Sequence, residues 1–327
     1  MSTSDLAPAR RARFAVTPQL GLAAIILLLV FGFAWRQPGF ISSFNLFGMG
    51  RSLAVDVTIG FSQMVVLSTG GMNLAVGSIG VCCVMFAGYL MQDVGLPVAI
   101  AFLLAVVLGG ALGWLNGFTI VRSGVNAFIV TLASANLYSG AMLILSRAQP
   151  INGLPQVVGS IGSYKIFNYA SPVLLVALVI GAALYVFYRY SVAGKETLMA
   201  GANARAATIS GVPVARTIVL AHVLSGMLAG VAGLMVVVRV GAAMPAVGGD
   251  DWLLPSFLGP VLGGTALAGG FVSVIGTLLG AMLVTVIRSG LLVLNVGNFW
   301  LQLFLGLFLL AAVIAQRYRG IFRSSLS

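Results

Sequence analysis

Long stretches of this chain carry no charged side chain, and they limit its fold more than any other feature of the sequence. Val57–Gln92 and Trp252–Ile287 each run for 36 residues without Lys, Arg, Asp or Glu. Charged residues make up only 7% of the 327 residues, whereas a soluble domain carries about 25%. So few charges cannot cover a water-facing surface, which excludes a cytosolic enzyme. The sequence predicts an all-α polytopic membrane protein.

About ten membrane-spanning helices are expected, because one span of the roughly 30 Å hydrocarbon core needs about 20 apolar residues. Each uncharged run of 36 residues would reach about 54 Å as a single helix. That is too long for one span, so we expect two segments in each run, with breaks near Gly70-Gly71-Met72-Asn73 and near Gly269-Gly270. The remaining apolar stretches predict six further spans, at Phe14–Trp35, between the turns 93–97 and 122–126, and at Phe128–Ser146, Pro172–Tyr188, Thr217–Val238 and Phe299–Ala315.

The basic residues are expected to orient these helices. A net charge of +11 would suggest a nucleic-acid partner for a soluble protein, but here it marks loops beside the lipid, and no nucleic acid is expected. With the N-terminus inside, eleven Lys and Arg residues fall on the cytoplasmic side and six outside, in line with the positive-inside tendency. We therefore expect cytoplasmic tails over 1–13 and 318–327 and a transmembrane domain over 14–317. A cleaved signal peptide is the alternative for the first span, but no small-x-small site precedes Arg36.

Two short segments of similar sequence suggest an internally repeated architecture. Val121-Arg122-Ser123-Gly124 resembles Ile287-Arg288-Ser289-Gly290, and each follows an apolar stretch with spaced glycines. The offset places the second expected span on the seventh, the fourth on the ninth and the fifth on the tenth, and an odd number of spans per half implies halves of opposite orientation. An inverted five-helix repeat is therefore expected, with chance similarity between glycine-rich helices as the alternative.

The two breaks are candidates for the translocation path. Backbone groups freed by a broken helix need partners in lipid, so such breaks persist where they are buried in protein or face a watery cavity; a tight turn at the membrane surface is the alternative. Glycines spaced by four elsewhere, such as Gly109, Gly113 and Gly117, are read as helix-packing positions. The path candidates are small and amide residues: Gly71, Asn73, Ser78, Asn116, Gly264 and Thr265.

Reactive side chains inside the spans are few. Asp56 is expected to form a surface pair with Arg51, five residues earlier, and His222 to bond to a neighbouring helix. The adjacent Cys82 and Cys83 are interpreted as packing residues that indicate neither a disulfide nor a metal site. Because intramembrane ionisable groups mark ion-coupled pathways, their scarcity counts against an ion-driven pump.

The chain carries no motif that could supply energy, so the energy must come from a partner or a downhill gradient. There is no GxxxxGK[ST] sequence to hold ATP phosphates, no catalytic constellation, and no cofactor is expected. The internal loop 191–216 is rich in small residues, and we expect one or two short helices there, bounded by Gly201 and Gly211, that dock on another protein. On the outer side, Arg147, Lys165, Arg239, Asp250 and Asp251 form charged loops suited to a soluble partner, with solvated loop charges as the alternative.

Several of these segments together resemble a known family. They are GGMNLAVGS at 70–78, GGALGWLNGFTIV at 109–121, FIVTLAS at 128–134 and VLGGTALAGGFVSVIGTLLGAM at 261–282, with the most specific stretch at 199–234. In these the chain resembles the permease subunits of ribose-type sugar ABC importers, a group that includes autoinducer-2 permeases. It departs from the pattern at Asn73, where an acidic residue is usual, at 125–127, where a proline pair is usual, and at 250–264, which leaves the solute open.

The resemblance implies a permease in the bacterial inner membrane that works as a dimer, of two copies or with a related sibling. It implies two ATPase subunits inside and a soluble substrate-binding protein outside, with alternating access carrying a monosaccharide or related polyol. Positions carried over to the ATPase-coupling loop are Gly201, Asn203, Ala206, Ala207 and Gly211. The alternatives are a permease for branched-chain amino acids or nucleosides, a stand-alone carrier or channel, and an intramembrane enzyme.

Overall fold

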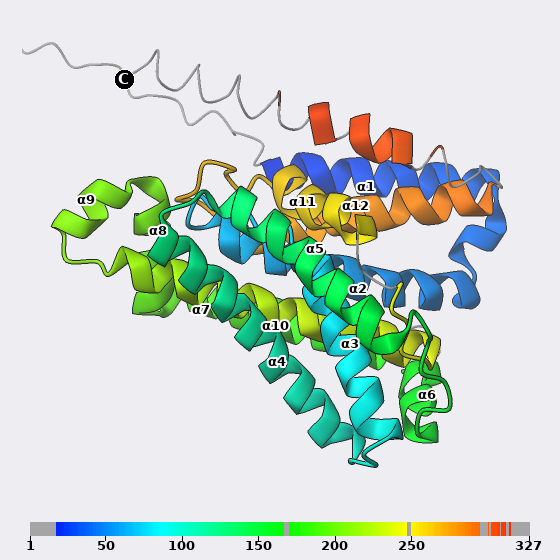
Figure 1. Ribbon diagram of the computed structural model, residues 1–327. Helices are drawn as coiled ribbons and strands as arrows, with labels where there is room; N and C mark the ends of the chain where they lie inside the picture. Colours follow the sequence, from blue (N-terminus) through cyan, green and yellow to red (C-terminus); the bar gives the residue numbers. More distant parts are fainter. Residues whose placement is uncertain are drawn as a thin grey trace, which may run out of the picture.

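The computed structural model describes residues 18–166, 170–246 and 250–294, together with 300, 302–307, 309–311 and 314. These residues form a helical bundle (Figure 1), and isolated backbone bridges link Ile151 to Ala243 and Ile166 to Ala170. The all-α prediction is confirmed for this part of the chain. The two predicted tails, 1–13 and 318–327, lie outside the described residues, as do the start of the first expected span and much of the last.

Six helices of the described part are long and apolar enough to cross a membrane. They agree with predicted spans to within a few residues, since each fills a charge-poor stretch of the sequence. They are α1 (Pro18–Arg36), α4 (Val98–Ser123), α5 (Ala127–Ser146), α7 (Pro172–Tyr190), α10 (Val214–Val240) and α12 (Val274–Val293).

Both of the long uncharged runs are divided, as predicted. In the first, α2 (Ser43–Leu67) and α3 (Val76–Gln92) flank a break over 68–75. In the second, α11 (Leu253–Leu262) and α12 flank a break over 263–273. Positive φ angles of 76° at Gly70, 89° at Gly269 and 80° at Gly270 turn the chain in a way that a residue with a Cβ rarely adopts.

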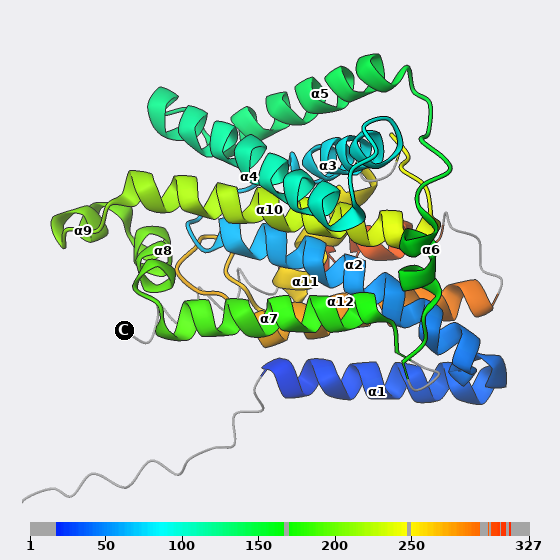
Figure 2. The same cartoon turned by 90° about the horizontal axis from the view of Figure 1, so that it is seen from below.

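Helix α10 lies at the centre of the bundle, between α4 on one side and α2 on the other (Figure 2). Glycines allow its close approach to α4, because a Cβ on Gly226 would overlap the Gly109 carbonyl oxygen and one on Gly113 would overlap that of His222. The same arrangement joins α11 and α12, where a Cβ on Gly280 would overlap the Gly259 carbonyl. The packing interpretation of these glycines is confirmed.

Short helices lie at opposite ends of the bundle. Helices α8 (Val192–Ala202) and α9 (Ala204–Ile209) lie at one end, and α6 (Gln156–Ser163) lies at the other (Figures 1 and 2). Single-turn helices η1 (Pro38–Ile41) and η2 (Asp250–Trp252) precede α2 and α11. The prediction of two short helices in the loop 191–216 is confirmed.

The two similar segments, 121–124 and 287–290, have different surroundings. Arg122 is exposed in the last turn of α4, which ends at Gly124 with φ 68°. Arg288 lies within α12, which continues past Gly290. The four similar residues therefore lie at the end of a helix at 121–124 but inside a helix at 287–290. The inverted repeat stays a prediction.

Candidate functional site

The first break is held in place by a buried polar network. The Asn73 side chain is 1% exposed, and its Nδ2 donates to Ser225 Oγ on α10 at 2.9 Å. Its Oδ1 accepts from the amide of Ala75 at 3.0 Å. Ser225 Oγ also lies 2.9 Å from Ser62 Oγ on α2. One amide side chain therefore joins the break to two helices of the bundle.

A second set of contacts ties the same break to α5. Thr131 Oγ1 accepts a hydrogen bond from the Leu74 amide at 3.1 Å and donates to the Ala127 carbonyl at 2.7 Å. Ser78 is buried and donates to the Ala75 carbonyl at 3.0 Å. Gly71 is partly exposed, and a Cβ there would lie 3.2 Å from Val66 Cγ1. These contacts give backbone groups freed by the break hydrogen-bond partners inside the protein.

Asn116 and His222 carry buried polar atoms that lack a partner within the described residues. Asn116 Oδ1 on α4 accepts from the Tyr138 hydroxyl at 2.8 Å, while its Nδ2 makes no hydrogen bond. His222 on α10 bonds through Nδ1 to the Ile218 carbonyl of its own helix at 2.9 Å, and its Nε2 has no partner. The expectation that His222 bonds to a neighbouring helix was therefore wrong, because the carbonyl one turn earlier is within reach.

The second break contributes one exposed and one buried path candidate. Gly264 is exposed with φ 86°, and nothing lies within 4 Å of an added Cβ. Thr265 is fully buried, and its Oγ1 accepts from the Ser273 amide at 3.2 Å. Thr265 thus holds the two ends of the loop 263–273 together, while Gly264 presents bare backbone.

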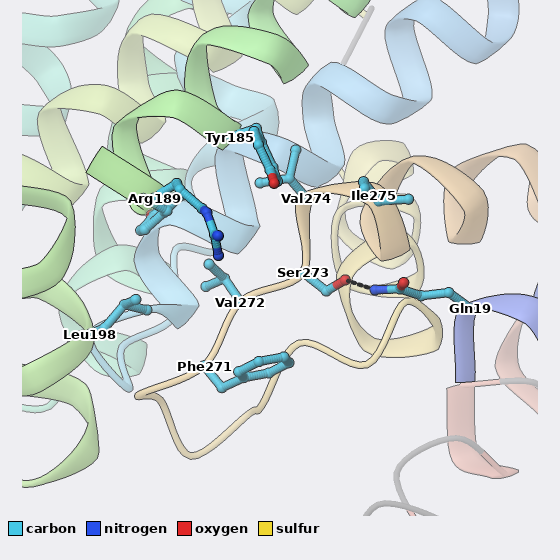
Figure 3. Close-up of a pocket in the computed structure, with 10 residues that line it drawn as sticks. Gln19, Tyr185, Arg189, Leu198, Phe271, Val272, Ser273, Val274 and Ile275 are labelled. Carbon is cyan, nitrogen blue, oxygen red and sulfur yellow. Dashed lines mark hydrogen bonds between the residues drawn. The ribbon is translucent and has the colours of Figure 1, made fainter. Parts of the chain in front are cut away.

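An open cavity of about 480 Å³ lies beside the second break (Figure 3). In the figure, Arg189 from the end of α7 extends toward Val272, with Leu198 of α8 nearby. On the side of the cavity away from Arg189, Gln19 of α1 donates from Nε2 to Ser273 Oγ at 3.0 Å. None of the predicted path residues lines this cavity, which instead borders α7, α8, the end of the second break and the start of α12.

The five predicted coupling residues lie at the α8–α9 end. Gly201 lies in the last turn of α8 and does not end that helix, which corrects its predicted role as a boundary. Asn203 separates the two helices, and its Oδ1 accepts from the Ala206 amide at 3.0 Å, which caps α9. Ala206 is exposed, Ala207 is buried, and Gly211 ends the segment with φ 84°. Ile209, 82% exposed, adds apolar surface to this end.

Asp56 is buried, and its partner is not the one expected from the sequence. Its Oδ2 lies 3.2 Å from Nη1 of Arg288 on α12, and Thr285 Oγ1 donates to the same oxygen at 3.3 Å. The predicted surface pair with Arg51 is therefore wrong. Arg51 instead donates to the main-chain carbonyl of Arg239. Spacing along one helix suggested the nearer arginine, whereas helix packing supplies the distant one.

Cationic side chains gather at the α6 end of the bundle. The Arg51 guanidinium lies 5.5 Å and the Lys165 ammonium 5.4 Å from the centre of the Phe47 ring. Arg239 Nη1 donates to Ser52 Oγ at 3.4 Å, which places this predicted contact residue in the same cluster. The sequence predicted an outer loop position for Lys165 and a pair with Asp56 for Arg51, whereas only their shared contact with Phe47 brings the two together.

The other predicted contact residues are only partly placed. Arg147 is exposed and caps α5 with φ 51°. Asp251 is exposed in η2, whereas the side chain of Asp250 lies outside the described part of the structure. Cys82 and Cys83 are free and buried, as the packing interpretation predicted, and within the described residues no three His, Cys, Asp or Glu side chains come close enough to hold a metal ion.

Comparison with known proteins connects this geometry to transport. Residues 45–313 match the family described as "Branched-chain amino acid transport system / permease component". The chain is 30% identical to the ribose import permease protein RbsC of Bacillus subtilis over 305 residues, which cover 93% of this chain and 92% of that protein.

Two further relatives resemble the chain over most of its length. The ribose import permease protein RbsC of Escherichia coli K12 is 29% identical, over 91% of this chain and 93% of that protein. The autoinducer 2 import system permease protein LsrD of Photorhabdus luminescens is 27% identical, over 83% and 86%. No solved structure matches the chain.

Proposed function

Because the chain belongs to the family of branched-chain amino acid transport system permease components, we propose that it is the membrane-spanning subunit of an ABC importer whose cargo is a monosaccharide or a related small polar solute. The observation that carries this proposal is the similarity to ribose import permeases along almost the whole chain. Relatives that import autoinducer 2 widen the solute class to other small polyhydroxylated molecules.

The proposed topology has ten spans, both termini in the cytoplasm of a bacterial cell, and two inverted halves of five. Six spanning helices support it directly, and α2, α3, α11 and the segment 302–311 would supply the rest. Helices α8 and α9 would face the cytoplasm, and the α6 end would face outward. The distribution of Lys and Arg along the sequence supports this orientation, because it places eleven of them on the side of α8 and α9 and six on the other side.

Energy for uphill import would come from two partner ATPase subunits docked at α8 and α9. The exposed Ile209 and Ala206 give this end an apolar surface suited to a protein partner, and Gly201, Asn203, Ala207 and Gly211 shape it. ATP-driven closure of the ATPases would shift the permease between inward- and outward-facing states. The permease would work as a dimer, with a second copy or a related sibling.

A soluble binding protein would deliver the solute at the α6 end, where Arg147, Arg239, Asp250 and Asp251 are the proposed contacts. Asn116 is the path candidate that the geometry favours, because its buried Nδ2 lacks a hydrogen-bond partner within the described residues. Gly264 offers an exposed backbone. Gly71, Asn73, Ser78 and Thr265 are proposed to shape the path by holding the two breaks in place.

A branched-chain amino acid is the second candidate cargo, since the description of the family itself favours it. The two cargoes differ in what the path must offer. An amino acid carries a carboxylate and an ammonium group, which require charged or strongly polar partners when desolvated, whereas a sugar needs only neutral hydrogen-bonding groups. The path candidates are all neutral residues, which favours the sugar.

Uptake by the reconstituted complex tests this proposal. The chain would be placed in proteoliposomes with its partner ATPase and binding protein, and uptake of labelled ribose and labelled leucine would be measured with and without ATP. We expect ATP-dependent uptake of the sugar and none of the amino acid. Uphill uptake by the chain alone would overturn the ABC assignment, and ATP-dependent leucine uptake without ribose uptake would overturn the sugar assignment.

A further inference from the structure

The end of α8 contacts both helix breaks at one point. We infer that Gly201, Ser68 and Gly270 form a backbone junction that joins α8 to the two breaks, so that a displacement of α8 moves both breaks as one body. This inference rests on the proposed function, in which α8 faces the ATPase. It assigns Gly201 a role as a positioning residue that the local sequence does not indicate.

Direct backbone contacts form the junction. The Gly270 amide donates to the Ser68 carbonyl at 3.0 Å, which links the second break to the first. Gly201 lies over this hydrogen bond. A Cβ there would overlap the Ser68 carbonyl oxygen and would lie 2.7 Å from the Gly270 nitrogen. Only a residue without a side chain allows the last turn of α8 to approach this closely.

Neighbouring glycines extend the same contact. A Cβ on Gly269 would lie 2.6 Å from the Gly70 nitrogen and 2.9 Å from the Gly201 carbonyl oxygen. A Cβ on Gly270 would lie 2.8 Å from Cβ of Ala202. The main chains of three segments, separated by more than 60 residues each along the sequence, therefore meet without side chains between them.

Such a junction passes a displacement of α8 on to both breaks almost undiminished. Side chains between two elements can change rotamer and absorb a small shift, whereas backbone packed on backbone has no such freedom. The first break is in turn bonded to α10 through Asn73 and to α5 through Thr131, so movement at the junction reaches the centre of the bundle. The cavity bordered by Leu198 and Val272 adjoins α8 and the second break.

Substitutions that insert a methyl group at the junction test the inference. In the reconstituted complex, Gly270→Ala should leave assembly and ATP hydrolysis in place and reduce solute uptake per ATP hydrolysed about tenfold. Gly201→Ala, which alters the proposed ATPase-docking segment as well as the junction, should reduce the same ratio. Gly124→Ala is the matched control for strain, because Gly124 also has a positive φ but nothing lies within 4 Å of an added Cβ. Gly140→Ala, at an open position on α5, controls for the added methyl itself. Both controls should retain the wild-type ratio.

A chemical cross-link between α8 and the second break gives an independent test without a clash, because Leu198 and Val272 line the same cavity. In the double variant Leu198→Cys/Val272→Cys, joining the two thiols with a bifunctional maleimide should leave uptake unchanged, because the joined segments move together. Loss of uptake on cross-linking, when each single variant treated with the same reagent keeps it, would overturn the inference. If Gly201→Ala prevents assembly, the cross-link decides.

The outcomes separate this inference from the function on which it rests. If the wild-type complex shows no ATP-driven uptake, the proposed function fails. If the wild type transports and Gly201→Ala and Gly270→Ala keep the wild-type ratio of uptake to hydrolysis, the junction alone is overturned.

Discussion

Arg288 of α12 and Asp56 of α2 form an ion pair across the helix interface, with Nη1 and Oδ2 3.2 Å apart. Asp56 is 6% exposed and also accepts a hydrogen bond from Thr285. One residue further along α12, Ser289 donates to Asn45 of α2 at 3.1 Å. Polar contacts therefore fasten α2 to α12 near one end of the bundle.

Replacing Arg288 with alanine should destabilise the protein by about 2–3 kcal/mol, because the Asp56 carboxylate would stay buried without its counter-charge. The double variant Asp56→Asn/Arg288→Ala should lose less, since no unpaired charge remains. The midpoint of thermal denaturation in detergent measures both. Arg122→Ala, at an exposed position at the end of α4, serves as the control and should shift the midpoint little. Strictly additive single substitutions at Asp56 and Arg288 would contradict a direct pair.

Replacing Asn73 with alanine should destabilise the protein. Asn73→Ala removes both the bond to Ser225 and the acceptor for the Ala75 amide, and leaving buried polar groups unpaired costs about 1–3 kcal/mol each. Asn73→Asp keeps the acceptor and should retain most of the stability lost in Asn73→Ala. The measurement is again the denaturation midpoint, alongside uptake. If Asn73→Ala kept its midpoint while solute preference changed, Asn73 would be a direct contact of the cargo and not a support for the break.

The third prediction concerns the close packing of α4 on α10. Gly226→Ala should reduce the yield of folded protein and lower the denaturation midpoint, because the new methyl group would overlap the Gly109 carbonyl oxygen and push the helices apart. Gly140→Ala adds the same methyl group at an open position on α5 and should be neutral or slightly stabilising, by up to about 1 kcal/mol. Equal midpoints for the two variants would show that the helices lie further apart than described.

The helices and their breaks could be predicted because they are local features of the sequence. An uncharged run longer than a bilayer is thick must be divided, and glycine pairs at 70–71 and 269–270 mark where the backbone can turn. Glycines four residues apart lie on one face of a helix, so their packing role also follows from spacing alone. These inferences need no knowledge of which helices are neighbours.

Contacts between distant segments could not be predicted in this way. Asp56 was paired with Arg51, five residues away, whereas Arg288 lies 232 residues along the chain. Asn73 was chosen as a path residue for its chemistry, but its partner Ser225 is 152 residues distant. Gly201 was interpreted as a helix boundary because glycine often ends a helix, whereas its lack of a side chain serves contact with the first break. In each case the missing information is which helix lies beside which.

Capping of α9 by Asn203 supports the last prediction, which concerns the proposed coupling end. Asn203→Ala removes the oxygen that accepts from the Ala206 amide, and loss of such a cap costs about 0.5–2 kcal/mol. A helix of six residues, Ala204–Ile209, has little other stability of its own, so α9 should fray and lose its docking surface. Uptake by the complex should fall, while insertion of the chain into the membrane stays normal.

Asn203→Asp and Asn203→Ser keep a side-chain oxygen at the cap and should restore uptake. Because both replacements lose the amide nitrogen, rescue by them would identify capping as the role of Asn203. If all three variants lost uptake equally, the amide itself would be the group that the ATPase recognises.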